Sequence, residues 1–173
     1  ATYLYIGLMG DTNRFLNPNL SVQVFDIAKI LFEKKADIEF VYENMYRSIN
    51  ERHIRAYQYF AKNLKIVENG QVAYIVFDVN TFKKLKLDHE DVKFCVDEMN
   101  SLKGVKVCFL CMGYEKDFYR ISMRSKKGFN TIICSAANGG GGHMCASAFD
   151  KKIKKSEMDK FIKYWGKEVV NGK

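Results

Sequence analysis

The first 64 residues pass from a continuous apolar run to an apolar pattern with helical spacing. Residues 3–9 are nearly all apolar, which predicts a strand that ends in a turn at residues 10–13. From Ser21, a residue type that caps helix N-termini, apolar positions recur every three or four residues as far as Leu64. Three successive helices are therefore predicted, with apolar positions at helical spacing, namely Val24, Ile27, Ala28 and Leu31, then Ile38, Val41, Tyr42, Met45 and Ile49, then Ile54, Tyr57, Ala61 and Leu64.

After the turn signal Asn69-Gly70, apolar strands alternate with amphipathic helices. The predicted strands are residues 72–79, 105–112 and 119–125, and the predicted helices are residues 90–102, 131–137 and 155–170. Strands interleaved with helices indicate an α/β fold, a sheet covered on at least one face. We therefore expect two parts, residues 1–69 and residues 70–173.

The composition is that of a folded protein with an excess of positive charge. Of the 173 residues 47% are hydrophobic, which is enough for a packed core. The formal net charge of +8 favours ligands that carry phosphate. Because the basic residues are spread along the chain, a basic surface that serves solubility explains the charge equally well.

Membrane and secreted classes are not expected. No apolar run reaches the roughly 18 residues that a membrane span requires. The five cysteines are odd in number and lack the dense spacing of a disulfide scaffold. A reducing, cytoplasmic location is the expectation that follows.

Three features look like metal or nucleophile motifs but have simpler explanations. Cys108 and Cys111 are three residues apart inside a predicted strand, so their side chains point to opposite faces. The acidic residues of the stretch 88–91 stand at a helix N-terminus, where they complement the helix dipole. His53 lies on a polar helix turn and is expected at the surface.

Two motifs predict a phosphate site. The stretch "NGGGGHMCAS", residues 138–147, contains backbone amides without flanking side chains, which can approach an anionic oxygen closely, and His143 follows them. Arg124 and Ser125 stand at the end of a predicted strand, where α/β sheets gather their ligands. Arginine can make two parallel hydrogen bonds to a phosphate. A glycine run alone is explained as often by a flexible hinge.

These motifs resemble a known family. "RISMRSKKGFN" (120–130) followed by "NGGGGHMCASAF" (138–149) is similar to the DHHA1 domain, the C-terminal half of DHH/DHHA1 phosphoesterases that include nanoRNases and pAp phosphatases. "HEDVKFCVDEMNSLKGVKVCFL" (89–110) resembles the helix and strand that precede the arginine motif in that domain. "LYIGLMGDTNRF" (4–15) looks like the last motif of the catalytic DHH domain. The resemblance covers essentially the whole chain.

The resemblance implies a fold and a set of roles. Residues 1–69 would be the end of the DHH domain with a helical connector, and residues 70–173 the DHHA1 domain, a mixed sheet flanked by helices. Asp11 would be a ligand of Mn²⁺ in a two-metal site. The substrate, a short RNA or a nucleotide such as pAp, would be held in a cleft between the domains by Arg124, Ser125, Gly140, Gly141, Gly142 and His143.

The chain departs from the family pattern at two places in its motifs and, more importantly, by the absence of other motifs. Asn13 replaces a glycine, and Ala146-Ser147-Ala148 replaces Ala-Ala-Gly. The earlier metal motifs, including Asp-His-His, are absent, so we expect a C-terminal fragment that lacks its N-terminal DHH domain and is inactive alone.

Three further possibilities stay open at this point. An RNA- or nucleotide-binding DHHA1 module without hydrolytic activity is the alternative function. The choice among short RNA, pAp and cyclic dinucleotides is also open. The apolar strand at residues 3–9, without its sheet, would be displaced or mobile, or would pair with a second copy as a homodimer.

Overall fold

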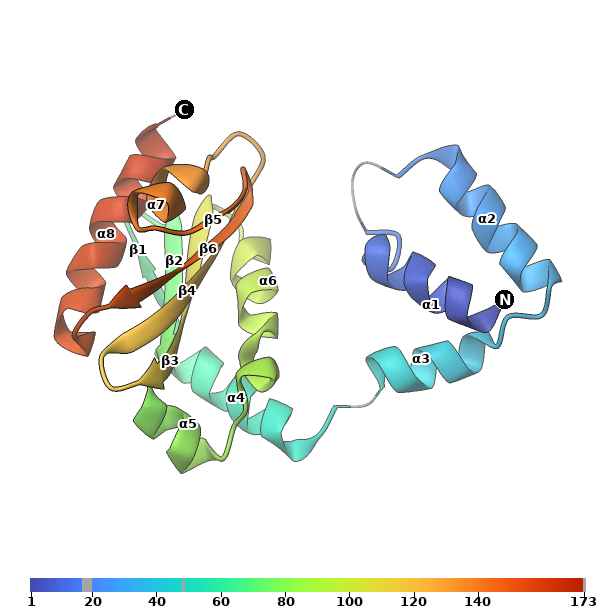
Figure 1. The fold of residues 1–173 in the computed structure, drawn as a ribbon, viewed down its shortest axis with the longest axis horizontal. Coiled ribbons are helices and arrows are strands. Elements are labelled where there is room, and N and C mark those ends of the chain that lie inside the picture. Colours follow the sequence, from blue (N-terminus) through green and yellow to red (C-terminus); the bar gives the residue numbers. More distant parts are fainter. Residues whose placement is uncertain (17–19, 48, 173) are drawn as a thin grey trace. The chain divides into compact units, whose positions relative to one another are not determined.

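The fold was analysed in a computed structural model that describes residues 1–16, 20–47 and 49–172. The chain forms two compact units, Ala1–Asn50 and Glu51–Lys173, and each is described by itself (Figure 1). In the described ranges, no helix is both long enough and apolar enough to cross a membrane.

The first unit is helical, and the predicted strand at residues 3–9 is wrong. This segment forms helix α1 (Thr2–Asp11), in which Tyr5 is buried and packs edge-on against Phe32 at 6.0 Å between ring centroids. A short apolar run fits either a strand or a helix, and a strand without a neighbour leaves its backbone groups unpaired. A helix satisfies those groups internally. The expected pairing of this segment, as a strand, with a second copy therefore loses its basis.

The predicted helices of the first unit are confirmed as α2 (Val22–Glu33) and α3 (Ile38–Tyr46). Ser21 occupies the N-cap position of α2 but makes no side-chain cap hydrogen bond, whereas the Asp37 carboxylate accepts from the amide of Phe40 at 2.9 Å and caps α3. A small core holds these helices together; its buried members are Tyr5, Leu31, Ala36 and Val41.

The second unit has a mixed α/β fold, which confirms the predicted fold class. Its six-stranded sheet has the order β1-β2-β3-β4-β6-β5, with β2 and β3 parallel and the other neighbours antiparallel. In chain order the elements are α4 (Glu51–Asn63), β1 (Lys65–Val67), β2 (Val72–Phe77), α5 (Val79–Leu85), the 3₁₀ helix η1 (His89–Val92), α6 (Phe94–Ser101), β3 (Val107–Glu115), β4 (Phe118–Ser125), α7 (Ile132–Ala137), β5 (Gly141–His143), β6 (Ala146–Lys152) and α8 (Lys155–Asn171).

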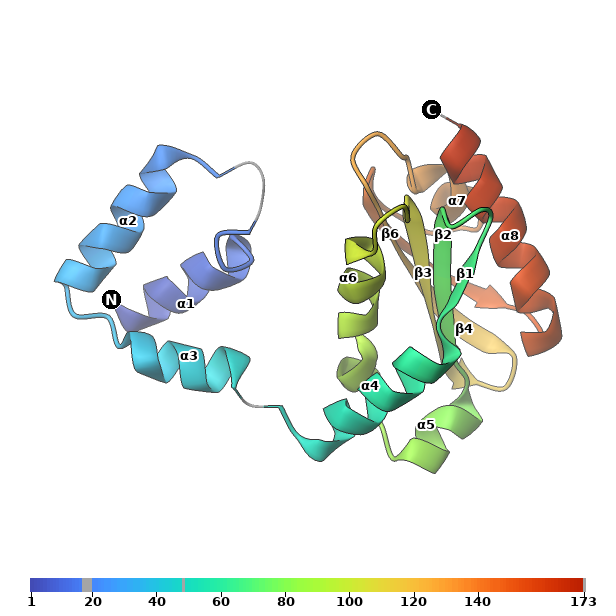
Figure 2. The same cartoon turned by 180° about the vertical axis from the view of Figure 1, so that it is seen from behind.

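Helices cover both faces of this sheet. Helix α6 lies on one side and α8 on the other, as both views show (Figure 1, Figure 2). Each face of the sheet has its own apolar core. Successive side chains of β3 point to opposite faces, so β3 contributes residues to both cores. Cys108 packs in the core beneath α6, and Cys111 packs in the core beneath α8. The prediction that these two cysteines point to opposite faces is confirmed.

The predicted division after residue 69 falls inside a hairpin. The turn itself is confirmed, because Glu68, Asn69 and Gly70 all have positive φ angles, of 51°, 55° and 84°. However, β1 pairs with β2 across this turn, and Ala56 of α4 is fully buried in the core. The compact unit therefore begins at Glu51, and α4 and β1 are parts of the sheet domain.

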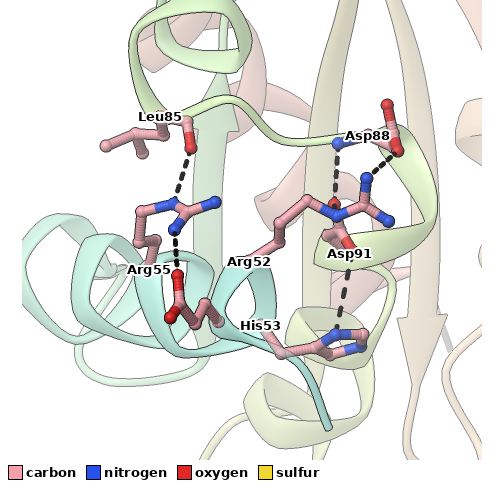
Figure 3. Close-up of polar contacts among 7 residues, drawn as sticks. Arg52, His53, Arg55, Leu85, Asp88 and Asp91 are labelled. Carbon is pink, nitrogen blue, oxygen red and sulfur yellow. Dashed lines mark hydrogen bonds and ion pairs between the residues drawn. The ribbon is translucent and has the colours of Figure 1, made fainter.

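A polar junction fastens α4 to the segment that follows α5 (Figure 3). Nε of Arg52 lies 3.2 Å from the buried Asp91 carboxylate, and its Nη1 lies 2.7 Å from the carboxylate of Asp88. Asp91 also accepts from the amide of Asp88 at 2.8 Å, and Nδ1 of His53 lies 3.7 Å from its other oxygen. Nε of Arg55 donates to the carbonyl of Leu85 at 2.8 Å. The acidic stretch 88–91 thus starts η1, as predicted, and also anchors α4.

This junction predicts a loss of stability when Asp91 is replaced. Asp91→Ala leaves the amide of Asp88 and Nε of Arg52 without their acceptor, while Nη1 of Arg52 keeps the carboxylate of Asp88. Because Arg52 is partly exposed, we expect a cost of about 1–3 kcal/mol in the free energy of unfolding, measured by urea denaturation. Glu90→Ala, at a neighbouring side chain that is 76% exposed, should change it by less than about 0.5 kcal/mol. Equal effects of the two substitutions would contradict this role of Asp91.

Candidate functional site

Strand β4 carries apolar side chains on one face and polar side chains on the other. Tyr119, Ile121 and Met123 are buried in the core beneath α8. The intervening residues Arg120, Ser122 and Arg124 point to the opposite face, since successive residues of a strand alternate between faces. This alternation places the guanidinium groups of Arg120 and Arg124 on one face of the sheet. Apolar side chains at these positions would have packed into a core instead.

The register of the sheet brings His143 onto the same face as Arg124. Arg124 pairs with Ala146 of β6, and Ala146 pairs in turn with His143 of β5. In the next row, Ser122 pairs with Ala148 and Ala148 pairs with Gly141. Side chains directly opposite each other on adjacent strands share a face. Two long polar side chains therefore flank a strip of sheet that carries only alanine, serine and glycine.

A cavity of about 700 Å³ lies over this strip. Its floor comes from β3, β4, β6 and β5, and its wall comes from η1 and α6. The cavity exists here because the residues that would fill it are small. On β6 the floor positions are Ala146 and Ala148, and on β5 it is Gly141.

The lining of the cavity includes three cationic side chains, Arg120, Arg124 and Lys93, and two carboxylates, Glu90 and Asp97. Arg124 is the central one: its Nη1 donates to the carbonyl of Met123 at 3.1 Å, and in residues 1–16, 20–47 and 49–172 no carboxylate forms an ion pair with it. Arg120 has only a long contact, 3.4 Å, to the carboxylate of Asp150. Lys93 is paired with Glu90 at 2.5 Å. Arg124 thus keeps most of its donors available for an anion.

Four of the six predicted phosphate-binding residues line this cavity, namely Arg124, Gly141, Gly142 and His143. The structure does not bring Ser125 to it. Ser125 is buried, and its hydroxyl donates to the carbonyl of Phe129 at 2.6 Å, which fixes the turn after β4. Gly140 is not part of the lining either, and its amide donates to the carbonyl of Ser135 at 2.8 Å.

The glycine run has a different explanation from the predicted amide nest. A Cβ on Gly140 would lie 2.2 Å from the carbonyl oxygen of Ala148, and one on Gly142 would lie 2.5 Å from that of Ala146. Both glycines are therefore required by the close approach of β6. Gly141 differs, because a Cβ there meets nothing within 4 Å and its φ is not positive. Only Gly141 leaves open space on the cavity side.

Comparison with known proteins finds relatives that are named NrnA. The chain is 31% identical over 148 residues to the bifunctional oligoribonuclease and PAP phosphatase NrnA of Mycoplasma genitalium, covering 85% of this chain and 45% of that protein. It is 31% identical over 149 residues to the probable NrnA of Streptococcus mutans, covering 85% of this chain and 46% of that protein. This chain is a relative of NrnA. The resemblance seen in the sequence is confirmed to that extent.

The chain spans about 45% of the length of its NrnA relatives. NrnA of Bacillus subtilis is also similar, at 23% identity over 148 residues, with 86% of this chain and 46% of that protein covered. No protein-family model matches the chain.

Two solved structures share the fold. An exopolyphosphatase-related protein from Bacteroides fragilis matches with a TM-score of 0.86 and 23% identity, covering 95% of this chain and 48% of that one. A pGpG-specific phosphodiesterase, PggH, from Vibrio matches with a TM-score of 0.50 and 15% identity, covering 96% of this chain and 55% of that one. At these identities the likeness concerns the fold alone.

The predicted metal ligand Asp11 is in the other unit of this NrnA relative. It is the last residue of α1 and is exposed. A carboxylate at a helix C-terminus is opposed by the helix dipole, so helix stability does not explain its presence there. The residues after it, Asn13, Arg14 and Phe15, have φ angles of 46°, 60° and 62°. Asn13 does adopt the left-handed backbone expected where the family pattern has glycine.

Among the described residues, no cysteine lines the cavity. Burial raises the pKa of Cys108 and of Cys134 to about 12, and it also raises the pKa values of Cys95 and Cys111. A thiol with a raised pKa is a poor nucleophile and a poor metal ligand. These cysteines serve the cores, as the sequence predicted for Cys108 and Cys111.

Sequence reasoning did not assign His89, Lys93, Tyr114 or Arg120 to the site, although their side chains line the cavity. A signal for Arg120 was present in the strand 119–125, where polar residues alternate with apolar ones. His89 was read as part of a cap, and its side chain instead reaches the cavity. Tyr114 lay beyond the predicted end of its strand, because β3 continues to Glu115.

The glycine contacts predict a stability pattern that an amide nest would not give. Gly140→Ala and Gly142→Ala should each lower the free energy of unfolding by about 1–3 kcal/mol, since the new methyl group overlaps the β6 backbone. Gly141→Ala is the matched control and should change it by less than about 0.5 kcal/mol. Thermal and urea denaturation would measure all three. Equal tolerance at Gly140, Gly141 and Gly142 would disprove the packing role.

Proposed function

We propose that the cavity of unit 2 binds a terminal phosphate of a nucleotide, as the substrate-binding part of a metal-dependent phosphoesterase that acts on short oligoribonucleotides, PAP or both. One observation carries the proposal. Arg124 has no carboxylate partner among the described residues, and it shares a sheet face with His143 across a single alanine. The names of the NrnA relatives support this class of substrate.

The dimensions of the sheet suit a phosphate between these two side chains. Arg124 and His143 are two strands apart, which separates their backbones by about 10 Å. Both side chains are long, and Ala146 between them leaves the space above the sheet free. A guanidinium can give two parallel hydrogen bonds to a phosphate, and an imidazole nitrogen can give another. Gly141 keeps the adjacent floor position open.

Asp11 is proposed as one Mn²⁺ ligand of the complete enzyme, because carboxylate oxygens suit this hard cation. Where the structure describes the chain, no three His, Cys, Asp or Glu side chains form a group that could hold a metal ion. The residues present therefore do not fit a two-metal site by themselves. In the proposal the remaining ligands belong to a DHH domain, a part that these relatives would contain beyond the matched 45% of their length.

The same observation favours a second candidate function. A DHHA1-like module that binds RNA or nucleotides without hydrolysis needs Arg124 and His143 but no metal ligands. The two functions differ in the role of Asp11, which a binding module does not require. A cytoplasmic location fits both, since the cysteines are free thiols, as expected in a reducing compartment.

The first test is phosphate binding. Arg124→Ala should weaken the binding of PAP by about 10- to 100-fold, because hydrogen bonds to a charged group contribute roughly 1.5–3 kcal/mol. Lys127→Ala is the charge-matched control: Lys127 is exposed, lies three residues away and does not line the cavity. Isothermal titration calorimetry on folded variants would measure both. Equal losses would mean that only the overall charge attracts the ligand, and unchanged affinity in R124A would place the ligand elsewhere.

The second test is catalysis by the 173-residue chain alone. With Mn²⁺ and either PAP or a dinucleotide, we expect no metal-dependent release of phosphate or mononucleotide. Chromatographic product analysis with and without a chelator would measure this. Turnover that the chelator abolishes would show that the chain holds its own metal site, and the proposal that ligands come from a further domain would then fail.

A further inference from the structure

Tyr114 lines the end of the cavity that lies away from Arg124, and a β-bulge in β3 determines its position. On β3, Gly113 pairs with Tyr119 and Glu115 pairs with Phe118, so Tyr114 is the extra residue of a β-bulge. Bulges redirect a side chain and are frequent beside functional sites. Tyr114 lines both the 700 Å³ cavity and a neighbouring cavity of about 560 Å³.

One face of the Tyr114 ring is supported by a neighbouring ring. It stacks on His89 with 4.0 Å between ring centroids and 8° between ring planes, and His89 is backed by Phe82 at 4.4 Å. Nε2 of His89 donates to the carbonyl of Gly113 at 3.2 Å, which fixes the imidazole. Tyr114 is nevertheless 48% exposed, so its remaining surface faces away from this stack.

Tyr114 lies well away from the proposed phosphate position. Arg124 pairs with Cys108, and Tyr114 is six residues further along β3. Six strand residues span about 20 Å, which exceeds the length of one nucleotide. Arg120, which pairs with Met112, lies between the two positions on the same face. The cavity therefore runs from a guanidinium and an imidazole, past a second guanidinium, to a rigid aromatic ring.

We propose that the Tyr114–His89 stack is a base-stacking platform for an oligoribonucleotide whose terminal phosphate is held at Arg124 and His143. The inference rests on the proposed function and adds to it the residues that would hold a base of the oligoribonucleotide. A base on Tyr114 and the phosphate at Arg124 belong to different nucleotides. PAP, a single nucleotide, occupies the phosphate end and does not reach the platform. Aromatic rings beside cationic groups are a common means of holding single strands without sequence preference.

Binding of pApApA and of PAP to matched variants separates this inference from the proposed function. Tyr114→Ala should weaken pApApA by about 5- to 100-fold and change PAP by less than about twofold. Tyr114→Phe keeps the ring and should behave as the wild type. Tyr164→Ala removes a tyrosine that is 57% exposed on α8 and does not line this cavity, and it should have no effect. Arg124→Ala should weaken both ligands.

Fluorescence gives a readout that a structural role would not change. In pApApA with 2-aminopurine at one position, stacking on Tyr114 should quench the second or third base but not the first. The quench should persist in Tyr114→Phe and disappear in Tyr114→Ala.

Each outcome of these measurements decides between the two proposals. If Tyr114→Ala binds pApApA like the wild type while Arg124→Ala does not, the platform is refuted and the proposed function stands. Equal weakening of PAP and pApApA in Tyr114→Ala would also refute the platform. If the wild type binds neither ligand, both proposals fail.

Discussion

The close approach of β5 to β6 is the constraint on which the candidate site depends. Gly140 and Gly142 allow the two backbones to meet where any Cβ would overlap a carbonyl oxygen of β6. The pairing that results sets His143 opposite Ala146, and so in the same row as Arg124. Without this contact His143 would lie in a loop with no fixed relation to β4. The glycines thus position the site through packing, and only Gly141 adjoins the cavity without a packing reason to be glycine.

Local patterns in the sequence predicted most of the sheet domain, because its signals are strong. The alternation at residues 119–125 has one good interpretation, and the apolar run at residues 72–79 follows a turn signal, which favours a strand; both became strands. The association of Arg124 with the glycine-histidine segment was also correct. The sequence could not predict the register in which β5 and β4 pair with β6. A strand of three residues such as β5 has no periodicity to detect, and the role of Ser125 depended on a turn that only the structure shows.

The first unit shows where the same reasoning fails. Residues 3–9 have apolar side chains at nearly every position, and the pattern does not distinguish a helix from a buried strand. The decision depends on whether neighbouring strands exist. Within unit 1 the segment has helical neighbours, and α1 buries Tyr5 while Tyr3 and Leu4 stay 86% and 71% exposed. A segment that buries so few side chains can still form all its backbone hydrogen bonds within itself as a helix, without a neighbouring strand.

The antiparallel pairing of β3, β4, β6 and β5 also sets the spacing of the charged and aromatic side chains that line the cavity. Side chains on one face recur every second residue along a strand, about 6.6 Å apart, and in register across neighbouring strands. Arg120, Ser122 and Arg124 therefore form a rigid ladder, and Ala146 and Ala148 on β6 prevent that ladder from being covered. The bulge at Tyr114 ends the regular spacing at the edge of the cavity, where a planar ring replaces a charge. The oligoribonucleotide proposed above likewise repeats a phosphate and a base in every unit.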